Sequence, residues 1–248
     1  MVLQSRAVHS EDKASRRAEI VAAVGRLLAR DPEYFASVAQ VAEEAGLAKG
    51  TVYLYFKTKE EMLMALHTDQ AMAMFDGMEA ILSLPDGVLT PEVVADGFVQ
   101  FVRQNPLFLQ VAGKCHSSLE RNIDPQVLIE HREAIARRLQ TAGAMIEARF
   151  PAFTAHGPYA GMSMLHYAYS YAIGAWQVCD PAHIAGHLAD MESTGSQMSP
   201  EMSIFVRDVY ADLRTGLLAL WYGMAAIAPA PASVPSSTPA LPKRAKRS

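Results

Sequence analysis

The sequence of 248 residues contains only two cysteines, Cys115 and Cys179, and no apolar run that approaches the length of a membrane helix. Two cysteines provide neither a disulfide framework nor the clustered thiolates of a structural zinc site. A membrane helix needs roughly 20 apolar residues, and residues 1–10 lack the apolar core of a secretory signal. These absences predict a cytoplasmic protein without a membrane partner.

The sequence also lacks the signatures of common enzymes. Residues 88–227 contain no phosphate-binding glycine loop and no nucleophile–base pair at motif spacing. His183 and His187 stand at i, i+4, but no third ligand accompanies them, so we predict no metal site. The chain is therefore expected to be neither an enzyme nor a cofactor-binding protein.

No segment shows the alternating pattern of a strand, whereas apolar residues recur at helical spacing along most of the chain. The sequence therefore predicts an all-α fold. Cap residues mark several helix starts, among them Thr58, Thr90 and Asp124, and the Ser199–Pro200 pair predicts the start of the last helix. The expected helices cover about residues 13–30, 37–45, 49–55, 58–83, 90–104, a segment after Pro106, 124–150, 159–178 and 199–226.

Charge is distributed unevenly although the net charge is only −4. Residues 1–60 carry nine Lys and Arg against eight Asp and Glu, whereas residues 61–242 carry nine against eighteen. An acidic body is repelled by nucleic acid, so the nearly neutral N-terminal part is the surface that would contact DNA. The last six residues carry four basic groups, for which a solvated chain end is the alternative to phosphate contact.

Two short helices joined by a tight turn are predicted within residues 37–56. Ser37 and Gln40 form a capping box at the start of the first helix, and Gly46 suits the left-handed position after its end. In the second helix Lys49, Gly50 and Thr51 lie near the start, where side chains reach base edges in the major groove. Tyr53, Tyr55, Lys57 and Lys59 follow as phosphate contacts. A capped helix pair in an ordinary bundle is the alternative.

This segment resembles the DNA-binding domain of the TetR (tetracycline repressor) family. The resemblance covers about residues 13–70, and two features depart from the family pattern: Ala48 replaces the usual Ser or Thr, and residues 31–35 lack a glycine often found there. The matching residues are Ser37, Val41, Ala42, Ala45, Gly46, Leu47, Gly50, Thr51, Val52, Tyr53, Tyr55, Phe56, Thr58, Lys59, Glu60, Met62 and Leu63.

The resemblance implies a homodimeric repressor with two domains, released from a palindromic operator in double-stranded DNA by a small-molecule effector. The expected parts are a flexible arm (1–12), a three-helix DNA-binding domain (13–60), a ligand-binding and dimerisation domain (61–227) and a disordered tail (228–248). Helices 159–178 and 200–226 look like the family's dimer-forming pair. The predicted DNA-binding set is Ser37, Lys49, Gly50, Thr51, Tyr53, Tyr55, Lys57 and Lys59.

Aromatic and methionine side chains in the second domain suit an apolar pocket for an apolar or aromatic effector. A simple packed core remains the alternative for each of these residues. A helical small-molecule binding protein without DNA function is the alternative for the whole chain. The predicted pocket residues are Phe75, Phe98, Phe101, Phe108, Met164, Tyr167 and Tyr171.

Overall fold

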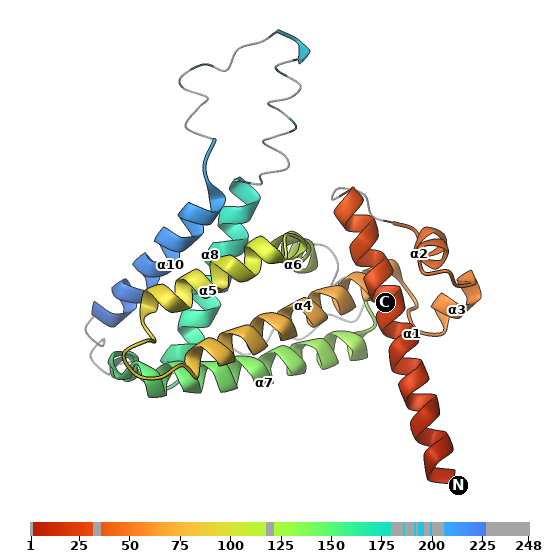
Figure 1. Cartoon of the computed structure of the whole chain (residues 1–248), viewed down its shortest axis with the longest axis horizontal. Helices are drawn as coiled ribbons and strands as arrows, with labels where there is room; N and C mark the ends of the chain where they lie inside the picture. The colour runs from red at the N-terminus through yellow and green to blue at the C-terminus, as the bar shows by residue number, and fades with distance from the viewer. Residues whose placement is uncertain are drawn as a thin grey trace, which may run out of the picture.

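The computed structural model describes residues 2–31, 36–117, 122–179 and 206–226, with a few isolated positions between residues 186 and 199. Within this part of the chain the regular structure is entirely helical, which confirms the predicted all-α class (Figure 1). The predicted tail at 228–248 and the two histidines His183 and His187 lie outside the described residues.

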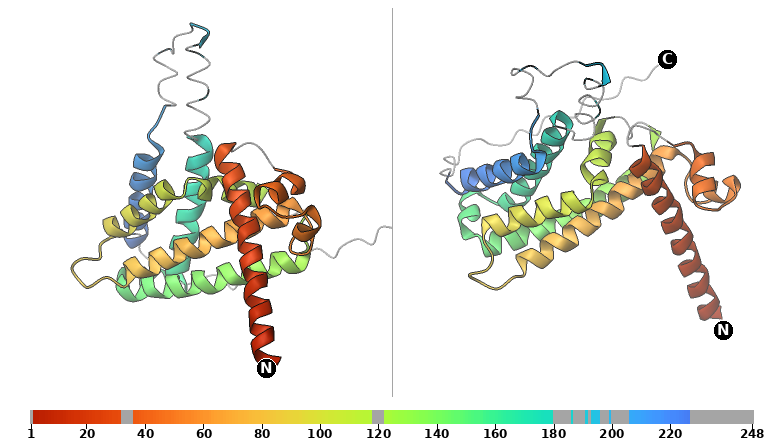
Figure 2. Two further views of the ribbon diagram at one scale, coloured as in Figure 1. Left: turned by 45° about the vertical axis from the view of Figure 1, so that its right-hand side comes forward. Right: turned by 45° about the horizontal axis from the view of Figure 1, so that its top comes forward.

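Three helices form the N-terminal end of the molecule: α1 (Val2–Arg30), α2 (Val38–Glu44) and α3 (Lys49–Tyr53). Helix α1 begins at Val2 instead of near residue 13, so the arm predicted at residues 1–12 is helical from Val2 onward. No proline or glycine interrupts residues 2–24, and the remaining residue types tolerate a helix. The start of α1 points away from the other helices (Figures 1 and 2).

Helix α4 (Lys59–Leu82) leaves this end and runs beside α7 (Pro125–Arg149), while α5 (Pro91–Gln104) and α6 (Leu107–Ser117) pack against it (Figure 1). The predicted caps are confirmed, because Thr58 Oγ1 accepts from Glu61 N–H at 3.1 Å and Thr90 Oγ1 accepts from Val93 N–H at 3.3 Å. Asp124 Oδ1 likewise accepts from Gln126 N–H at 2.9 Å.

Thr58 caps α4, but Thr58 and Glu61 do not form a full capping box. The Glu61 carboxylate does not return to the Thr58 N–H but accepts from the Lys57 N–H at 2.7 Å. Glu61 is buried, so its side chain connects the start of α4 to the segment that follows α3.

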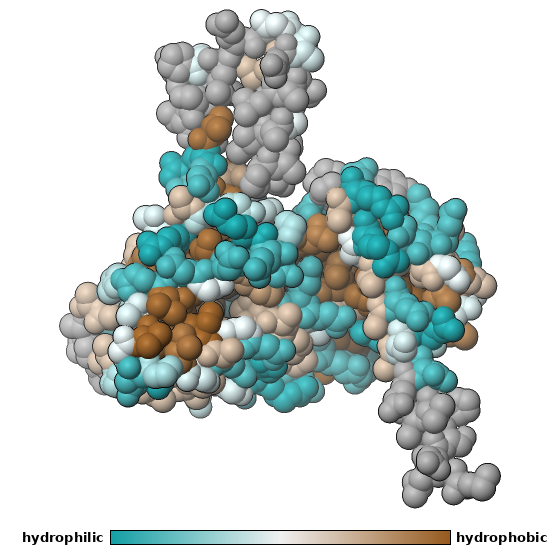
Figure 3. Space-filling view, in the orientation of Figure 1, coloured by the Kyte–Doolittle hydropathy of each residue, from teal (hydrophilic) through white to brown (hydrophobic). Residues whose placement is uncertain are grey.

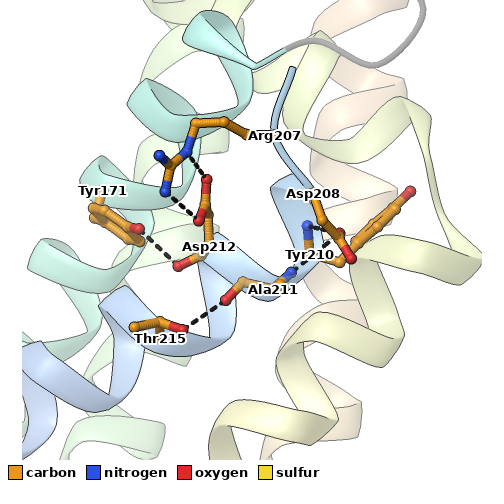
Figure 4. Close-up of polar contacts among 7 residues, drawn as sticks. All are labelled: Tyr171, Arg207, Asp208, Tyr210, Ala211, Asp212 and Thr215. Carbon is orange, nitrogen blue, oxygen red and sulfur yellow. Dashed lines mark hydrogen bonds and ion pairs between the residues drawn. The ribbon is translucent and has the colours of Figure 1, made fainter. Parts of the chain in front are cut away.

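At the far end, the 3-10 turn η2 (Pro151–His156) leads to α8 (Ala160–Val178), which packs against α10 (Val209–Ala226). The predicted start of the last helix at Ser199–Pro200 is wrong, since residues 206–208 are not helical. Asp208 provides the cap instead, because its Oδ1 accepts from the Tyr210 and Ala211 N–H groups at 3.0 and 3.2 Å (Figure 4).

Two hydrophobic cores meet within α4. The first joins α1, α2 and α3 to the first turns of α4, as far as Leu66, and also takes Val111 and Cys115 from α6. The second begins at Ala71 and reaches α10. The division between the cores therefore lies between Leu66 and Ala71, beyond the domain boundary expected at residues 60/61, and one continuous helix belongs to both.

The molecular surface is mainly hydrophilic on the face shown in Figure 3, with an apolar area at the end remote from α2 and α3. None of the helices in the described part of the chain has the length and apolar character needed to span a bilayer.

Candidate DNA-binding surface and ligand cavity

The turn between α2 and α3 has the geometry that the sequence predicts. Gln40 Oε1 accepts from Ser37 N–H at 3.0 Å and Ser37 Oγ accepts from Gln40 N–H at 3.4 Å, which confirms the capping box. Gly46 has φ = 66°, a left-handed conformation that favours glycine. The Leu47 N–H donates to the Ala42 carbonyl at 2.8 Å, so the chain turns sharply into α3.

Helix α3 is anchored by its inner side and leaves its outer side exposed. Val52 and Phe56 are buried in the first core. On the outer side Lys49, Gly50 and Tyr53 are exposed, and the Lys49 ammonium lies 5.9 Å from the centre of the Tyr53 ring. Of the other predicted residues, Thr51 and Tyr55 are partly exposed, and Tyr55 also packs against the first core.

Gly50 and Leu54 add to this surface. A Cβ at Gly50 would meet no atom within 4 Å, so packing inside the protein does not require glycine there, and the bare backbone is open to a close partner. Leu54 is 79% exposed between the two tyrosines. The sequence reasoning missed Leu54; its apolar side chain between Tyr53 and Tyr55 was the available signal.

Lys57 lies apart from the α3 residues and has a partner at the start of α7. Its ammonium is 2.9 Å from the Asp124 carboxylate, the cap of α7. The Lys57 hydrogen bond is the main reason that the pKa of Asp124 is lowered, and the Asp124 hydrogen bond raises the pKa of Lys57. A DNA phosphate at Lys57 would have to compete with Asp124. Lys59 is the first residue of α4, where backbone N–H groups favour an anion.

Glu44 joins α1 to α2 through two arginines of α1. Its carboxylate accepts from Arg26 Nε at 2.7 Å and from Arg30, and its carbonyl accepts from Arg26 Nη2 at 3.1 Å. These side-chain hydrogen bonds lower the pKa of Glu44. The ion pairs connect the end of α2 to α1, next to the turn that leads into α3.

A cavity of about 610 Å³ lies in the second core, within the range of roughly 300–1,000 Å³ typical of small-molecule sites. Its wall is mostly aliphatic and aromatic and comes from six helices. The residues of α4, α5 and α6 are His67, Ala71, Met74, Phe75, Met78, Val94, Ala95, Phe98 and Phe108. Those of α7, α8 and α10 are His131, Arg132, Ile135, Ala136, Leu139, Met164, Leu165, His166, Ala168, Tyr169, Ser170, Ile173, Leu217 and Trp221.

Four of the seven predicted pocket residues, Phe75, Phe98, Phe108 and Met164, line this cavity. Phe101 does not; it packs edge-on against Phe108, with ring centres 5.2 Å apart. Tyr167 is half exposed on the outside of α8. Tyr171 instead joins α8 to α10, since its hydroxyl donates to the Asp212 carbonyl at 2.8 Å (Figure 4).

Sequence reasoning missed the polar side of the cavity. His67 Nε2 lies 2.9 Å from the Tyr169 hydroxyl, and His131 Nδ1 lies 2.7 Å from the Thr68 hydroxyl. The two imidazole rings are 5.4 Å apart. These residues lie far apart in the sequence, so no motif spacing links them. No group of three His, Cys, Asp or Glu side chains in the described residues is arranged to hold a metal ion.

A helix–turn–helix unit with an exposed second helix, joined by one long helix to a body with an apolar cavity, defines a DNA-binding regulator that responds to a ligand. Comparison with known proteins supports this class of protein. The family described as bacterial regulatory proteins, tetR family, matches residues 20–66, and the tetracyclin repressor-like C-terminal domain matches residues 68–226. The chain belongs to the TetR family of transcriptional regulators and is therefore not an enzyme.

The individual proteins that resemble this chain share only a short segment or a low sequence identity with it. The fatty acid metabolism regulator protein of Bacillus subtilis is 32% identical over 69 residues, a match that spans 28% of this chain and 36% of that protein. The solved structure of the fatty acid degradation regulator FadR from Bacillus halodurans has a TM-score of 0.52 and 15% identity, over 83% of this chain and 94% of that one. PfmR, a TetR family regulator from Thermus thermophilus, has a TM-score of 0.50 and 14% identity, over 81% and 96%. At these identities the two structures show the fold alone.

Proposed function

We propose that the protein is a homodimeric repressor that binds a palindromic operator through α3 and leaves it when a small apolar molecule enters the cavity. The path of α4 is the main support. Met62, Leu63 and Leu66 of this helix pack in the first core, beneath α3, and Ala71 and Phe75 line the cavity. A ligand that shifts α4 relative to α7 would therefore change how α3 is presented.

The required coupling is large. To move an operator-binding state from 99:1 to 1:99, the effector must prefer the other state by about 10⁴-fold, or roughly 5.5 kcal/mol. Such a preference is reached more readily if the ligand contacts several helices at once, and the cavity wall includes residues of α4, α7 and α8.

Mutation of Tyr53 tests the DNA-binding surface. A selection from random duplexes would identify the operator, and Tyr53→Ala should then weaken binding to operator and unrelated DNA together, as loss of a phosphate contact does. Thr51→Ala should instead alter base preference. Gln100→Ala, an exposed change on α5, is the control. Unchanged DNA affinity in Tyr53→Ala would remove this residue from the interface.

The dimer proposal is supported by an uncharged exposed stripe on each of α8 and α10. On α8 the stripe contains Tyr167, Ser170, Gly174 and Val178, and on α10 it contains Ala211, Thr215, Ala219 and Tyr222. Helix α8 contains no Asp, Glu, Lys or Arg. Depletion of charge is typical of the core of a protein interface.

Sedimentation velocity tests the dimer. The wild-type protein should sediment as a dimer at micromolar concentration, and Gly174→Arg should give monomers because it places a charge in the stripe. Gln100→Arg introduces the same charge on exposed α5 and should leave the dimer intact. A wild-type monomer, with or without DNA, would contradict the proposal.

A further inference from the structure

Leu54, at the end of α3, is the most exposed large apolar residue in the described part of the chain, with 79% of its surface accessible. Helix α3 lies at the outer edge of the molecule (Figure 1), and the proposed function places this helix in the major groove of DNA. The side chain of Leu54 is therefore available to touch base edges there.

The backbone holds Leu54 in a fixed direction. Its φ and ψ are −72° and −20°, which are helical values, and its N–H donates to the Thr51 carbonyl at 3.1 Å. Two residues later the Phe56 N–H donates to the Val52 carbonyl at 3.0 Å, and the side chains of both these residues are buried in the first core. Because the chain is anchored on either side of Leu54, its exposed side chain projects from an ordered helical turn.

Gly50 lies one turn before Leu54 on the same side of the helix. A Cβ at Gly50 would meet no atom within 4 Å, so the backbone is bare at this point and no side chain there screens Leu54. On the neighbouring row the Lys49 ammonium lies 5.9 Å from the centre of the Tyr53 ring. The outer side of α3 thus has an apolar part, Gly50 and Leu54, beside a part that carries an ammonium and a phenol. We call Gly50 and Leu54 the apolar notch.

The chemistry of the apolar notch limits what it can recognise. The leucine side chain has no hydrogen-bond donor or acceptor, so it cannot read the polar atoms of a base. In the major groove the apolar group on a base edge is the C5 methyl group of thymine, and apolar side chains recognise thymine through it. Phosphate contacts, for which Lys49 and Tyr53 are suited, position a protein on DNA but carry no sequence information.

We propose that Leu54 contacts the C5 methyl group of a thymine in each operator half-site and so determines the base preference at that position. This inference rests on the proposed function and adds a specificity-determining residue to the same surface. Gly50 lets the base edge approach the backbone of α3, and Leu54 covers the methyl group. Since the methyl group itself is read, a cytosine methylated at C5 binds more tightly at this position than an unmodified cytosine.

Replacement of thymine by deoxyuridine tests the contact, because it removes only the methyl group. In the operator identified by selection from random duplexes, the thymines of one half-site are replaced one at a time, and fluorescence anisotropy gives the Kd of the full-length protein. At one position the replacement should weaken wild-type binding about fourfold, the size expected for burial of a single methyl group. At the same position 5-methylcytosine should bind more tightly than cytosine by the same factor.

Two variants assign the effect to a side chain. Leu54→Ala should bind the thymine and deoxyuridine operators with nearly equal Kd, and it should fold normally because Leu54 is exposed. Thr51→Ser is the matched control, since it removes a methyl group from a side chain one turn away on α3 and keeps the hydroxyl group. This control should keep the full difference between the two operators.

The outcomes separate this inference from the proposed function. A wild-type Kd that no methyl removal changes, or a selected half-site without thymine, would overturn the role of Leu54 and leave operator binding by α3 in place. A methyl effect that survives in Leu54→Ala, or that disappears in Thr51→Ser, would assign the contact to another residue and overturn it as well. Failure of the selection to enrich any operator would reject the proposed function, and the inference with it.

Discussion

Two glycines allow α7 and α8 to cross with their backbones in contact. A Cβ at Gly161 would lie 2.1 Å from the Gly143 carbonyl oxygen, and a Cβ at Gly143 would lie 2.8 Å from the Met162 backbone nitrogen. Both distances are too short for any real contact, and the obstructing atoms are backbone atoms that cannot rotate away. The close approach of α7 and α8 therefore requires glycine at both positions.

Gly161→Ala should lower the free energy of unfolding by about 1–3 kcal/mol, the usual cost of overpacking a core. Gly77→Ala is the matched control, because Gly77 lies within α4 and a Cβ there meets nothing within 4 Å; it should be neutral or stabilising by up to about 1 kcal/mol through helix propensity. Urea unfolding of both variants measures the difference. Equal stability of the two would refute the backbone contact.

Glu44 makes the anchorage of α2 dependent on pH. Its pKa in the folded protein is lowered by hydrogen bonds from Arg26 and Arg30. A lowered folded pKa contributes stability that is present above the unfolded value, here 4.5, and is lost as the pH falls through the folded value.

Glu44→Gln should therefore unfold at lower urea concentration than the wild type at about pH 7, and this difference should shrink as the pH falls below 4.5. The comparison variant is Glu43→Gln, an exposed neighbour on the same turn. A wild-type advantage that stayed constant from neutral to acidic pH would show that the ion pairs with Arg26 and Arg30 contribute nothing.

At the scale of the elements, the contact between Lys57 and the start of α7 would compete with a DNA phosphate at Lys57. Asp124 both caps α7 and pairs with Lys57. Asparagine retains the ability to cap a helix but has no charge. Asp124→Asn should therefore leave α7 intact and release Lys57 for a phosphate.

We expect Asp124→Asn to bind DNA more tightly than the wild type, with a salt dependence steeper by about one phosphate contact. Fluorescence anisotropy at several KCl concentrations measures both quantities. Adding Lys57→Gln to Asp124→Asn should cancel the gain. If the double variant binds DNA as tightly as Asp124→Asn alone, Lys57 is not a phosphate contact.

Local signals predicted the elements well where a cap or a turn is encoded by neighbouring residues. The Ser37–Gln40 capping box, the left-handed Gly46 and the Thr90 and Asp124 caps are of this kind. The last helix was predicted to start at Ser199–Pro200, whereas α10 begins at Val209 with Asp208 as its cap. Helical spacing cannot distinguish these alternatives.

The cavity was only partly predictable for a related reason. Helical periodicity shows which side chains face inward, but whether they meet or leave a space depends on how the helices pack. Phe98 and Phe101 of α5 illustrate this, since Phe98 lines the cavity and Phe101 packs behind Phe108. His67, His131 and Tyr169 of the cavity come from three separate helices, and no local pattern in the sequence links them.

At the scale of the whole molecule, α4 is the connection on which the proposed regulation depends. Its first turns belong to the core beneath α3, and its middle lines the cavity. The ion pair of Lys57 and Asp124 also connects the segment after α3 to the start of α7. Because closely packed cores shift between discrete arrangements and do not deform smoothly, occupation of the cavity should change DNA affinity as a two-state response.

The most direct test is a titration of labelled operator DNA, monitored by fluorescence anisotropy, at fixed concentrations of an apolar competitor that displaces a fluorescent probe from the cavity. The account predicts that the Kd for the operator rises with the fraction of cavities occupied and that Tyr53→Ala weakens binding whether or not the competitor is present. An operator Kd that stays unchanged when the cavity is saturated would contradict the coupling through α4.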